Sequence, residues 1–224
     1  MWNIFAGWNA MTNGAGDRAM SHYLYRRRAA GETARVTRMP ETVRLLEPDS
    51  RADHMLGPHD APITVIEYGD FECPKCKQAA GALKLLFARF DQRVRFVFRH
   101  FPLEEIHPHA LQAAQAAECA GGQGRFWEMY DLLFANQRHL ELRRLHDYAR
   151  SLGLDMALFT AAMRGEVYLQ RVREHRRSGE YNRLRSTPTF FVNGRIQDVS
   201  FGLLALFDGV ADELRSLTPD NNQG

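Results

Sequence analysis

The chain has 224 residues, of which 45% are apolar and 25% charged, with a formal net charge of +2. These values are typical of a soluble globular protein with one sizeable core. Its 29 basic residues are balanced by 27 acidic ones and no run of about 18 apolar residues occurs, so we predict neither a nucleic-acid partner nor a membrane span.

Residues 1–53 are predicted to form an N-terminal extension, poorly ordered or partly helical, because they show no sustained apolar period. Ala19–Ala30 could form a short helix within it. Met1–Met20 lacks the basic stretch, apolar core and small-residue cleavage site of a secretory signal. We therefore expect a cytoplasmic protein, with export as the alternative if translation starts elsewhere.

The first predicted strand runs from Pro62 to Tyr68, where nearly every residue is apolar or β-branched, as in a strand buried on both faces. Glu67 shares a face of this strand with Ile63 and Val65. Burial of a carboxylate is costly, so this side chain either reaches water or an arginine, or has a raised pKa and accepts a proton. We favour the proton acceptor.

Two thiols, Cys73 and Cys76, lie three residues apart where this strand gives way to a helical pattern over Lys75–Phe90. This is the spacing of a redox pair. Cys73, at the helix start, is predicted to ionise easily and to be the nucleophile, with Cys76 as the resolving thiol. Pro74 suits the first helical position, and Lys75 adds a positive charge between the thiols.

A zinc site is the alternative interpretation of this spacing. Zinc normally needs four ligands, so the pair would have to recruit Cys119 and one histidine, for which the candidates are His100, His107 and His109. Cys119 lies between alanines on a predicted helix, where a buried thiol usually serves packing. We therefore predict neither a bound metal nor a cofactor.

A second strand, Arg93–His100, completes a strand–helix–strand unit whose reactive pair lies at the carboxyl end of the first strand. From about residue 103 to 185 the pattern is helical, and about 80 residues is too long for a loop. We predict an inserted helical lobe with helices near His109–Ala120, Phe126–Phe134, Leu142–Leu152, Asp155–Met163 and Glu166–Tyr181.

After the lobe, Thr187 and Pro188 precede an apolar run that ends in Asn193-Gly194, a typical hairpin turn. We predict a hairpin over Thr189–Asp198. A closing helix over Phe201–Leu217 and a tail at residues 218–224 follow. Taken alone, Pro188 is best explained as an ordinary trans proline at a strand start.

Together, the separated motifs resemble the DsbA-like branch of the thioredoxin superfamily. They occur in that family's order over roughly residues 54–216, within a predicted domain at residues 54–217: Ile66–Cys76, Arg99–Leu103, His107–His109, Gln123–Met129 and Thr187–Gly194. The resemblance implies an α/β, thioredoxin-like fold with a helical insertion between its βαβ and ββα halves. It also implies that Pro188 is cis, next to the sulfurs, and that Glu67 matches a glutamate of the family.

The same resemblance implies a thiol–disulfide oxidoreductase. Cys73 would attack, Cys76 would resolve the mixed disulfide and Glu67 would manage the proton, while Pro74, Lys75, Thr187 and Pro188 would contact the substrate. Partners would be protein or peptide thiols and disulfides, plus a redox protein that regenerates the pair. Oxidase, reductase and isomerase remain open, although Lys75 mildly favours an oxidant, and the sequence does not indicate an oligomeric state.

Overall fold

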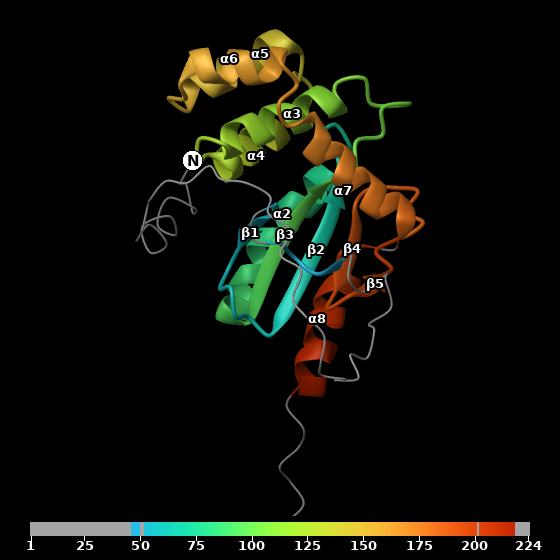
Figure 1. Ribbon diagram of the computed structural model, residues 1–224. Coiled ribbons are helices and arrows are strands. Elements are labelled where there is room, and N and C mark those ends of the chain that lie inside the picture. Colours follow the sequence, from blue (N-terminus) through green and yellow to red (C-terminus); the bar gives the residue numbers. More distant parts are fainter. Residues whose placement is uncertain (1–45, 50–51, 201, 218–224) are drawn as a thin grey trace, which may run out of the picture. The chain divides into compact units, whose positions relative to one another are not determined.

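The computed structural model describes residues 46–49, 52–200 and 202–217 (Figure 1). The helix predicted at Ala19–Ala30 lies outside these ranges. The described chain is built on one mixed sheet with strand order β1-β3-β2-β4-β5. In chain order the strands are β1 (His54–Leu56), β2 (Ile63–Gly69), β3 (Val94–His100), β4 (Thr189–Val192) and β5 (Arg195–Gln197).

The two central strands, β2 and β3, are parallel, and α2 (Pro74–Phe90) connects them. A short 3-10 turn, Asp91–Arg93, leads from α2 into β3. Both strands are buried along almost their whole length and are rich in apolar and β-branched residues, although β3 also carries Arg95, Arg99 and His100. The predicted strand–helix–strand unit is confirmed, with the thiols just after β2.

Strand β1 was not predicted. Its three residues pair antiparallel with β3 at the edge of the sheet, and so short a segment has no recognisable period. The chain that precedes β1 also contains two buried residues. Leu46 packs in a cluster with Ile66 and Val97, and Asp53 is 8% exposed. The folded unit therefore includes residues that the sequence analysis assigned to the N-terminal extension.

The predicted helical lobe is confirmed between β3 and β4. Its helices are α3 (Ala110–Gly121), α4 (Phe126–Ala135), α5 (Leu142–Ser151), α6 (Met156–Arg164) and α7 (Leu169–Tyr181). In Figure 1, α3 to α6 lie beyond the end of the sheet toward which β2 and β3 run. Helix α7 starts three residues later than predicted, because Glu166 has a left-handed backbone (φ 49°) within a turn.

The last part of the fold is a hairpin followed by a helix, as predicted. Asn193 and Gly194, with φ of 44° and 80°, form the turn between β4 and β5. The Asn193 side chain accepts a hydrogen bond from the Thr64 amide at 2.8 Å, which ties the turn to β2. Helix α8 covers Leu204–Leu217 and starts later than predicted. In the described part of the chain, no helix is both long and apolar enough to cross a membrane.

The two faces of the sheet have separate cores. On one face Phe96 and Phe98 of β3 pack against Trp127 and Tyr130 of α4, with ring centroids 5.9 and 5.1 Å apart. On the other face the core consists of Leu46, Ile66, Tyr68, Val97, Phe101, Leu184 and Phe191. Side chains alternate between the faces of a strand, so Glu67 lies on the face opposite Ile66, the same face as its register partner Phe98.

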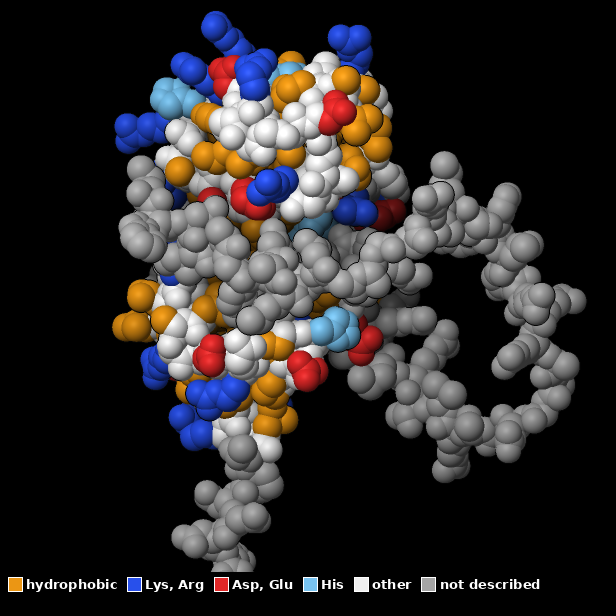
Figure 2. All heavy atoms as spheres, turned by 90° about the vertical axis from the view of Figure 1, so that its left-hand side faces the viewer, with side chains coloured by type: hydrophobic (Ala, Val, Ile, Leu, Met, Phe, Trp, Pro, Cys, Tyr) orange, Lys and Arg blue, Asp and Glu red, His pale blue; other side chains and the backbone are white. Residues whose placement is uncertain are grey.

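Charged side chains of both signs are interspersed on the surface that Figure 2 shows. Several basic residues form exposed ion pairs, including Arg150 with Asp147 at 2.9 Å and Arg176 with Glu104 at 2.6 Å. Such exposed pairs contribute little to stability.

Candidate active site

The first thiol, Cys73, is the N-cap residue of α2, at the positive end of the helix dipole. Cys73 has an extended backbone (φ −75°, ψ 121°), and Pro74 occupies the first helical turn as predicted. The Cys73 amide donates to the Asp70 carbonyl at 3.1 Å, which closes the turn between β2 and α2. The Cys73 sulfur therefore lies at the positive end of the helix dipole, where the first backbone amides have no partner within the helix.

The two sulfurs differ in accessibility. Cys73 and Cys76 are both free thiols; Cys73 retains 6% of its surface and Cys76 none. The Cys73 thiol lies 3.3 Å from the Thr187 carbonyl, to which it can donate, and the Asp70 amide donates to the Cys76 sulfur at 3.4 Å. Only Cys73 can therefore be reached from outside without rearrangement.

Their acidities differ in the same sense. The hydrogen bond from Cys76 lowers the pKa of Cys73 to about 5 despite burial, helped by Thr187 and by the backbone amides of Lys75 and Cys76. Burial raises the pKa of Cys76 well above its usual value, and its interactions with Cys73 and Glu67 raise it further. At neutral pH the pair holds one thiolate, on Cys73.

Glu67 is buried as predicted, with 1% of its surface exposed. It is the register partner of Phe98 in β3 and Phe190 in β4. Its Oε1 atom has no hydrogen-bond partner among the described residues. Burial raises the pKa of Glu67 well above its usual value, and the negative charge of Cys73 raises it further. The carboxyl group can therefore hold a proton near the thiols at neutral pH.

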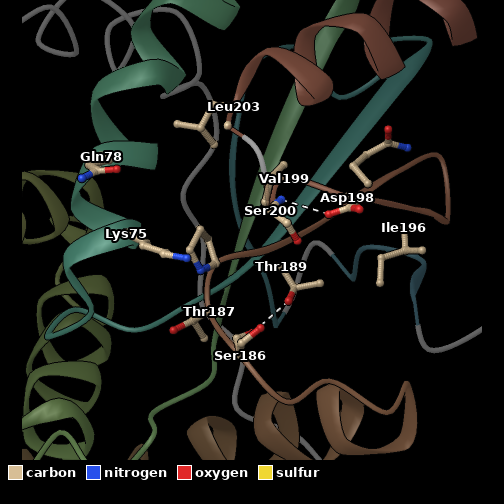
Figure 3. Close-up of a pocket in the computed structure, with 13 residues that line it drawn as sticks. Lys75, Gln78, Ser186, Thr187, Thr189, Ile196, Asp198, Val199, Ser200 and Leu203 are labelled. Atoms are coloured by element: carbon tan, nitrogen blue, oxygen red, sulfur yellow. Dashed lines mark hydrogen bonds between the residues drawn. The ribbon is translucent and has the colours of Figure 1, made fainter.

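A groove of about 510 Å³ runs beside the start of α2 (Figure 3). Of the four predicted substrate-contact residues, Lys75, Thr187 and Pro188 line it, whereas Pro74 does not. The Thr187–Pro188 peptide bond is cis, as the family resemblance implies. The remaining lining residues are Gln78, Ser186, Thr189, Ile196, Gln197, Asp198, Val199, Ser200, Gly202 and Leu203. The lining includes both polar and apolar side chains.

Gln137 was missed by the sequence analysis. Its side-chain amide donates to the carbonyls of Phe71 and Cys73, both at 2.8 Å, from the segment that follows α4. It thus fixes the turn that presents the nucleophile. No local pattern identifies such a residue, because the contact spans more than sixty positions of the chain.

A second missed group is the buried carboxylate of Asp70. It accepts hydrogen bonds from the amides of Glu72 at 2.8 Å and Leu103 at 2.9 Å, and its Oδ2 atom lies 2.8 Å from His107 Nδ1. The Glu72 side chain accepts from the amide of His109 at 2.7 Å. The His107 side chain and the His109 backbone amide therefore help to organise the turn before Cys73.

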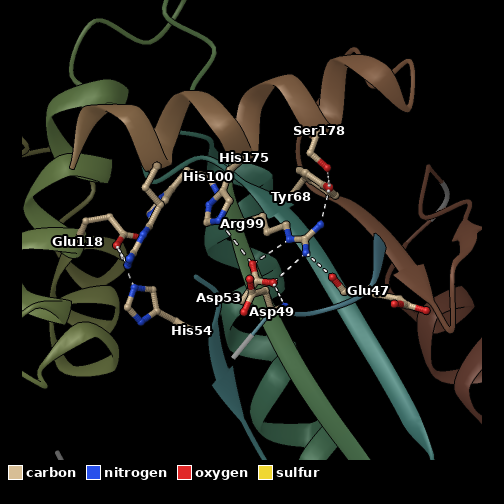
Figure 4. Close-up of polar contacts among 11 residues, drawn as sticks. Glu47, Asp49, Asp53, His54, Tyr68, Arg99, His100, Glu118, His175 and Ser178 are labelled. Atoms are coloured by element: carbon tan, nitrogen blue, oxygen red, sulfur yellow. Dashed lines mark hydrogen bonds and ion pairs between the residues drawn. The ribbon is translucent and has the colours of Figure 1, made fainter. Parts of the chain in front are cut away.

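A polar network joins the sheet to the lobe (Figure 4). Arg99 binds Asp53 with two hydrogen bonds of 2.8 and 2.9 Å, and it also donates to the Tyr68 hydroxyl at 3.1 Å. Next to it, Glu118 of α3 binds His100 at 2.8 Å and His54 at 3.1 Å. These contacts hold α3 against β1 and β3.

The same network bears on the zinc alternative. Within the described ranges, His100, Glu118 and His175 are the group whose ligand atoms could meet on one ion, and no thiol belongs to it. Each oxygen of Glu118 already has a partner, since Arg171 binds the second oxygen at 2.9 Å alongside His54. Burial alone would raise the pKa of Glu118, but hydrogen bonds from the histidines hold it well below its usual range. We interpret this group as a structural ion-pair network.

Cys119 is 3% exposed on α3, and burial raises its pKa to about 12, with a further contribution from Glu118. It is therefore protonated and unreactive at neutral pH. We expect Cys119→Ala to retain the full rate of disulfide exchange and to lose about 1 kcal/mol of stability, the cost of a small cavity. Insulin reduction and urea unfolding measure the two quantities; a lost rate at unchanged stability would give this thiol a chemical role.

A family model and several solved structures match this chain. A sequence model described as Thioredoxin matches residues 49–202. Oxidised BdbD from Bacillus subtilis superimposes with a TM-score of 0.68 at 23% identity, covering 75% of this chain and 96% of BdbD. For alpha-DsbA1 from Wolbachia pipientis the values are 0.67 and 19%, covering 79% of this chain and all of that protein. At these identities the likeness shows the fold.

Curated relatives with higher sequence identity than these solved structures are named as Na(+)/H(+) antiporters. The chain is 46% identical over 158 residues to Na(+)/H(+) antiporter NhaA 1 of Salinispora arenicola, an alignment covering 70% of this chain and 24% of the antiporter. The chain therefore spans about a quarter of the length of the curated relatives it matches.

Proposed function

The chain belongs to the thioredoxin family, and on this premise we propose that it is a DsbA-like member that exchanges disulfides with protein or peptide substrates through Cys73 and Cys76. One observation carries the proposal: an easily ionised thiol at a helix start contacts Thr187, directly before Pro188, while its partner thiol is buried behind it. That arrangement separates an attacking sulfur from a resolving one.

In the reducing direction, the Cys73 thiolate attacks a substrate disulfide and releases one substrate sulfur as a thiolate. Cys76 then loses its proton and attacks the Cys73 sulfur, which breaks the mixed disulfide and frees the second substrate thiolate. The chain ends with a disulfide between Cys73 and Cys76. In the oxidising direction the same bonds form and break in reverse order, and a substrate thiolate attacks Cys73.

The acidity of Cys73 favours the oxidising direction. A pKa of about 5 means that the reduced pair contains a stabilised thiolate, and the disulfide form gains nothing from the same hydrogen bonds. Whatever stabilises only the reduced form makes the disulfide a stronger oxidant. A separate redox protein must then regenerate the disulfide.

The groove supports an extended peptide as the substrate. Ser186, Thr187 and Thr189 offer backbone and hydroxyl groups on one side, and Lys75 offers an ammonium group on the other (Figure 3). Ile196 is 62% exposed at the far end of the groove and provides an apolar contact. Backbone contacts of this kind suit exchange with many sequences.

Ion transport is not part of this proposal. The region shared with the Salinispora arenicola antiporter, 158 residues, is close in length to the stretch that the thioredoxin model matches. We therefore propose that the shared region corresponds to the thiol-bearing domain.

The experiment that tests the function measures exchange and potential on the whole chain. We expect it to catalyse the reduction of insulin by dithiothreitol, and its pair to have a reduction potential closer to about −120 mV than to the roughly −270 mV of a reductase. Zinc analysis with and without chelator is the parallel measurement. Stoichiometric zinc bound by the thiols, without exchange activity, would support the metal-binding alternative instead.

Glu67→Gln is expected to slow the resolving step and to spare the first attack. An amide has nearly the same shape as the carboxyl group but cannot accept the Cys76 proton, so we expect resolution to slow by about a hundredfold near pH 7. The defect should shrink as rising pH ionises Cys76 without help. Stopped-flow exchange with a model disulfide between pH 6 and 9 measures both steps, and identical pH profiles would make Glu67 a structural residue.

A further inference from the structure

The core on the α4 side of the sheet contains two unpartnered polar atoms. Among the described residues, Glu67 Oε1 and the Tyr130 hydroxyl are both buried without a hydrogen-bond partner. Tyr130 is 2% exposed and Glu67 1%. Leaving one such group unpaired is costly, so two in one core require an explanation.

A shared neighbour links the two side chains. Phe98 lies opposite Glu67 in the β2–β3 register, and its ring centroid is 5.1 Å from that of Tyr130. A Cβ atom placed on Gly69 would lie 3.1 Å from Glu67 Oε1 and in collision with the Phe98 ring, so this oxygen and this ring meet above Gly69. Phe71 also encloses the Tyr130 ring, at 5.8 Å.

Among the described residues, few ionisable groups lie around the Glu67 carboxyl group. Cys73 and Cys76 face Glu67 from α2 and Tyr130 approaches from α4, whereas the residues that face it from β3 and β4 are Phe98 and Phe190. Burial raises the pKa of Tyr130 well above its usual value, and the charges of Glu67, Cys76 and Asp131 raise it further. The phenol therefore keeps its proton and can donate it in a hydrogen bond.

We propose that Tyr130 is a positioning residue whose hydroxyl donates a hydrogen bond to the Glu67 carboxylate across one water molecule, and so prepares Glu67 to take the proton of Cys76. The proposal rests on the exchange reaction proposed above and adds a residue to it. A donor of this kind stabilises the ionised carboxylate where no arginine or lysine of the described chain pairs with it.

The proton and electron balance of the step is unchanged by Tyr130. Cys76 transfers its proton to Glu67, its sulfur bonds to the Cys73 sulfur, and the bond between Cys73 and the substrate sulfur breaks. The substrate leaves as a thiolate. Tyr130 keeps its own proton throughout and acts only on the readiness of Glu67 to accept one.

The test removes one oxygen atom. Tyr130→Phe keeps the ring contacts and removes only the hydroxyl group, so the variant should fold. We expect the first attack by Cys73 to be unchanged. The resolving step should slow roughly tenfold near pH 7, as for one lost hydrogen bond to a charged group, and its pH profile should move upward by about one pH unit. Tyr148→Phe, which removes a hydroxyl bonded to the His139 carbonyl, is the matched control.

A double variant separates positioning from packing. In a Glu67→Gln background, Tyr130→Phe should have no further effect on the resolving step, because the group it serves is gone. An equal slowing in both backgrounds, or an unshifted pH profile, would overturn the proposal.

A second measurement stands apart from turnover. The infrared carbonyl band of protonated Glu67, identified by its loss in Glu67→Gln, should move to higher frequency in Tyr130→Phe. An unmoved band would overturn the proposed contact. Absence of exchange in the wild-type chain would refute the proposed function, and the band would still decide whether Tyr130 binds Glu67.

Discussion

Cys73→Ser should reduce disulfide exchange to the uncatalysed rate, and Cys76→Ser should accumulate mixed disulfides through Cys73. With a pKa of about 5, Cys73 is about 99% ionised at pH 7, against roughly 3% for an ordinary thiol. Serine at position 73 provides no thiolate, whereas serine at position 76 removes the resolving sulfur and leaves the attack intact. Non-reducing gels and mass spectrometry after incubation with a disulfide-bonded peptide measure both results.

Cys119→Ser is the matched control, because it replaces the third thiol in the same way and should trap nothing. The acidity of the nucleophile has its own readout: the rate of alkylation of Cys73 by iodoacetamide should fall with a midpoint near pH 5 as the thiolate takes up a proton. Equal trapping by the Cys73→Ser and Cys76→Ser variants would reverse the assignment of the two sulfurs.

Asp53→Asn should destabilise the fold by about 3–5 kcal/mol at pH 7, because it removes the carboxylate that the buried Arg99 guanidinium binds through two hydrogen bonds. Arg99 is 5% exposed, and both of its bonds to Asp53 are shorter than 3.0 Å. Urea unfolding of the two proteins measures the difference. Asp60→Asn, at an exposed site, is the matched control and should stay within about 0.5 kcal/mol of the wild type.

The pH dependence of the pair gives a second readout. Burial would raise the pKa of Asp53, but hydrogen bonds from His175 and Arg99 hold it well below its usual range. A carboxylate whose pKa is lower in the folded than in the unfolded state stabilises the fold above about pH 4 and loses that contribution as pH falls further. The wild type should therefore lose stability below about pH 4, and Asp53→Asn should lose less. Parallel losses would show that Asp53 is not responsible.

The parts of the site that the sequence predicted are those encoded by neighbouring residues. Cys73, Pro74 and Cys76 define a helix start by themselves, and Glu67 stands out because a carboxylate interrupts an apolar strand. The strands and helices with a clear period were also predicted, with boundaries within about three residues. Pro188 was recognised through family resemblance and not through its local pattern.

The parts that were missed depend on contacts between distant segments. Gln137 donates to the carbonyl of Cys73 from 64 positions further along the chain. Asp53 binds Arg99, which lies 46 positions further along the chain. Tyr130 has a helical spacing that predicts a core aromatic residue but says nothing about where its hydroxyl points. Strand β1 is defined by its antiparallel pairing with β3, which its own sequence does not indicate. None of these relations leaves a periodic signal in the sequence.

The two hydrogen bonds of Gln137 have a consequence for modularity. In covalent terms the helical lobe is an insertion that a shorter chain could omit. The rest of the fold nevertheless depends on the lobe for its stability, because Gln137 of the lobe donates the hydrogen bonds to the carbonyls of Phe71 and Cys73. Excising the lobe would remove those donors and expose the face of the sheet that holds Glu67, so a minimal version would keep the thiols but lose the surroundings that distinguish them.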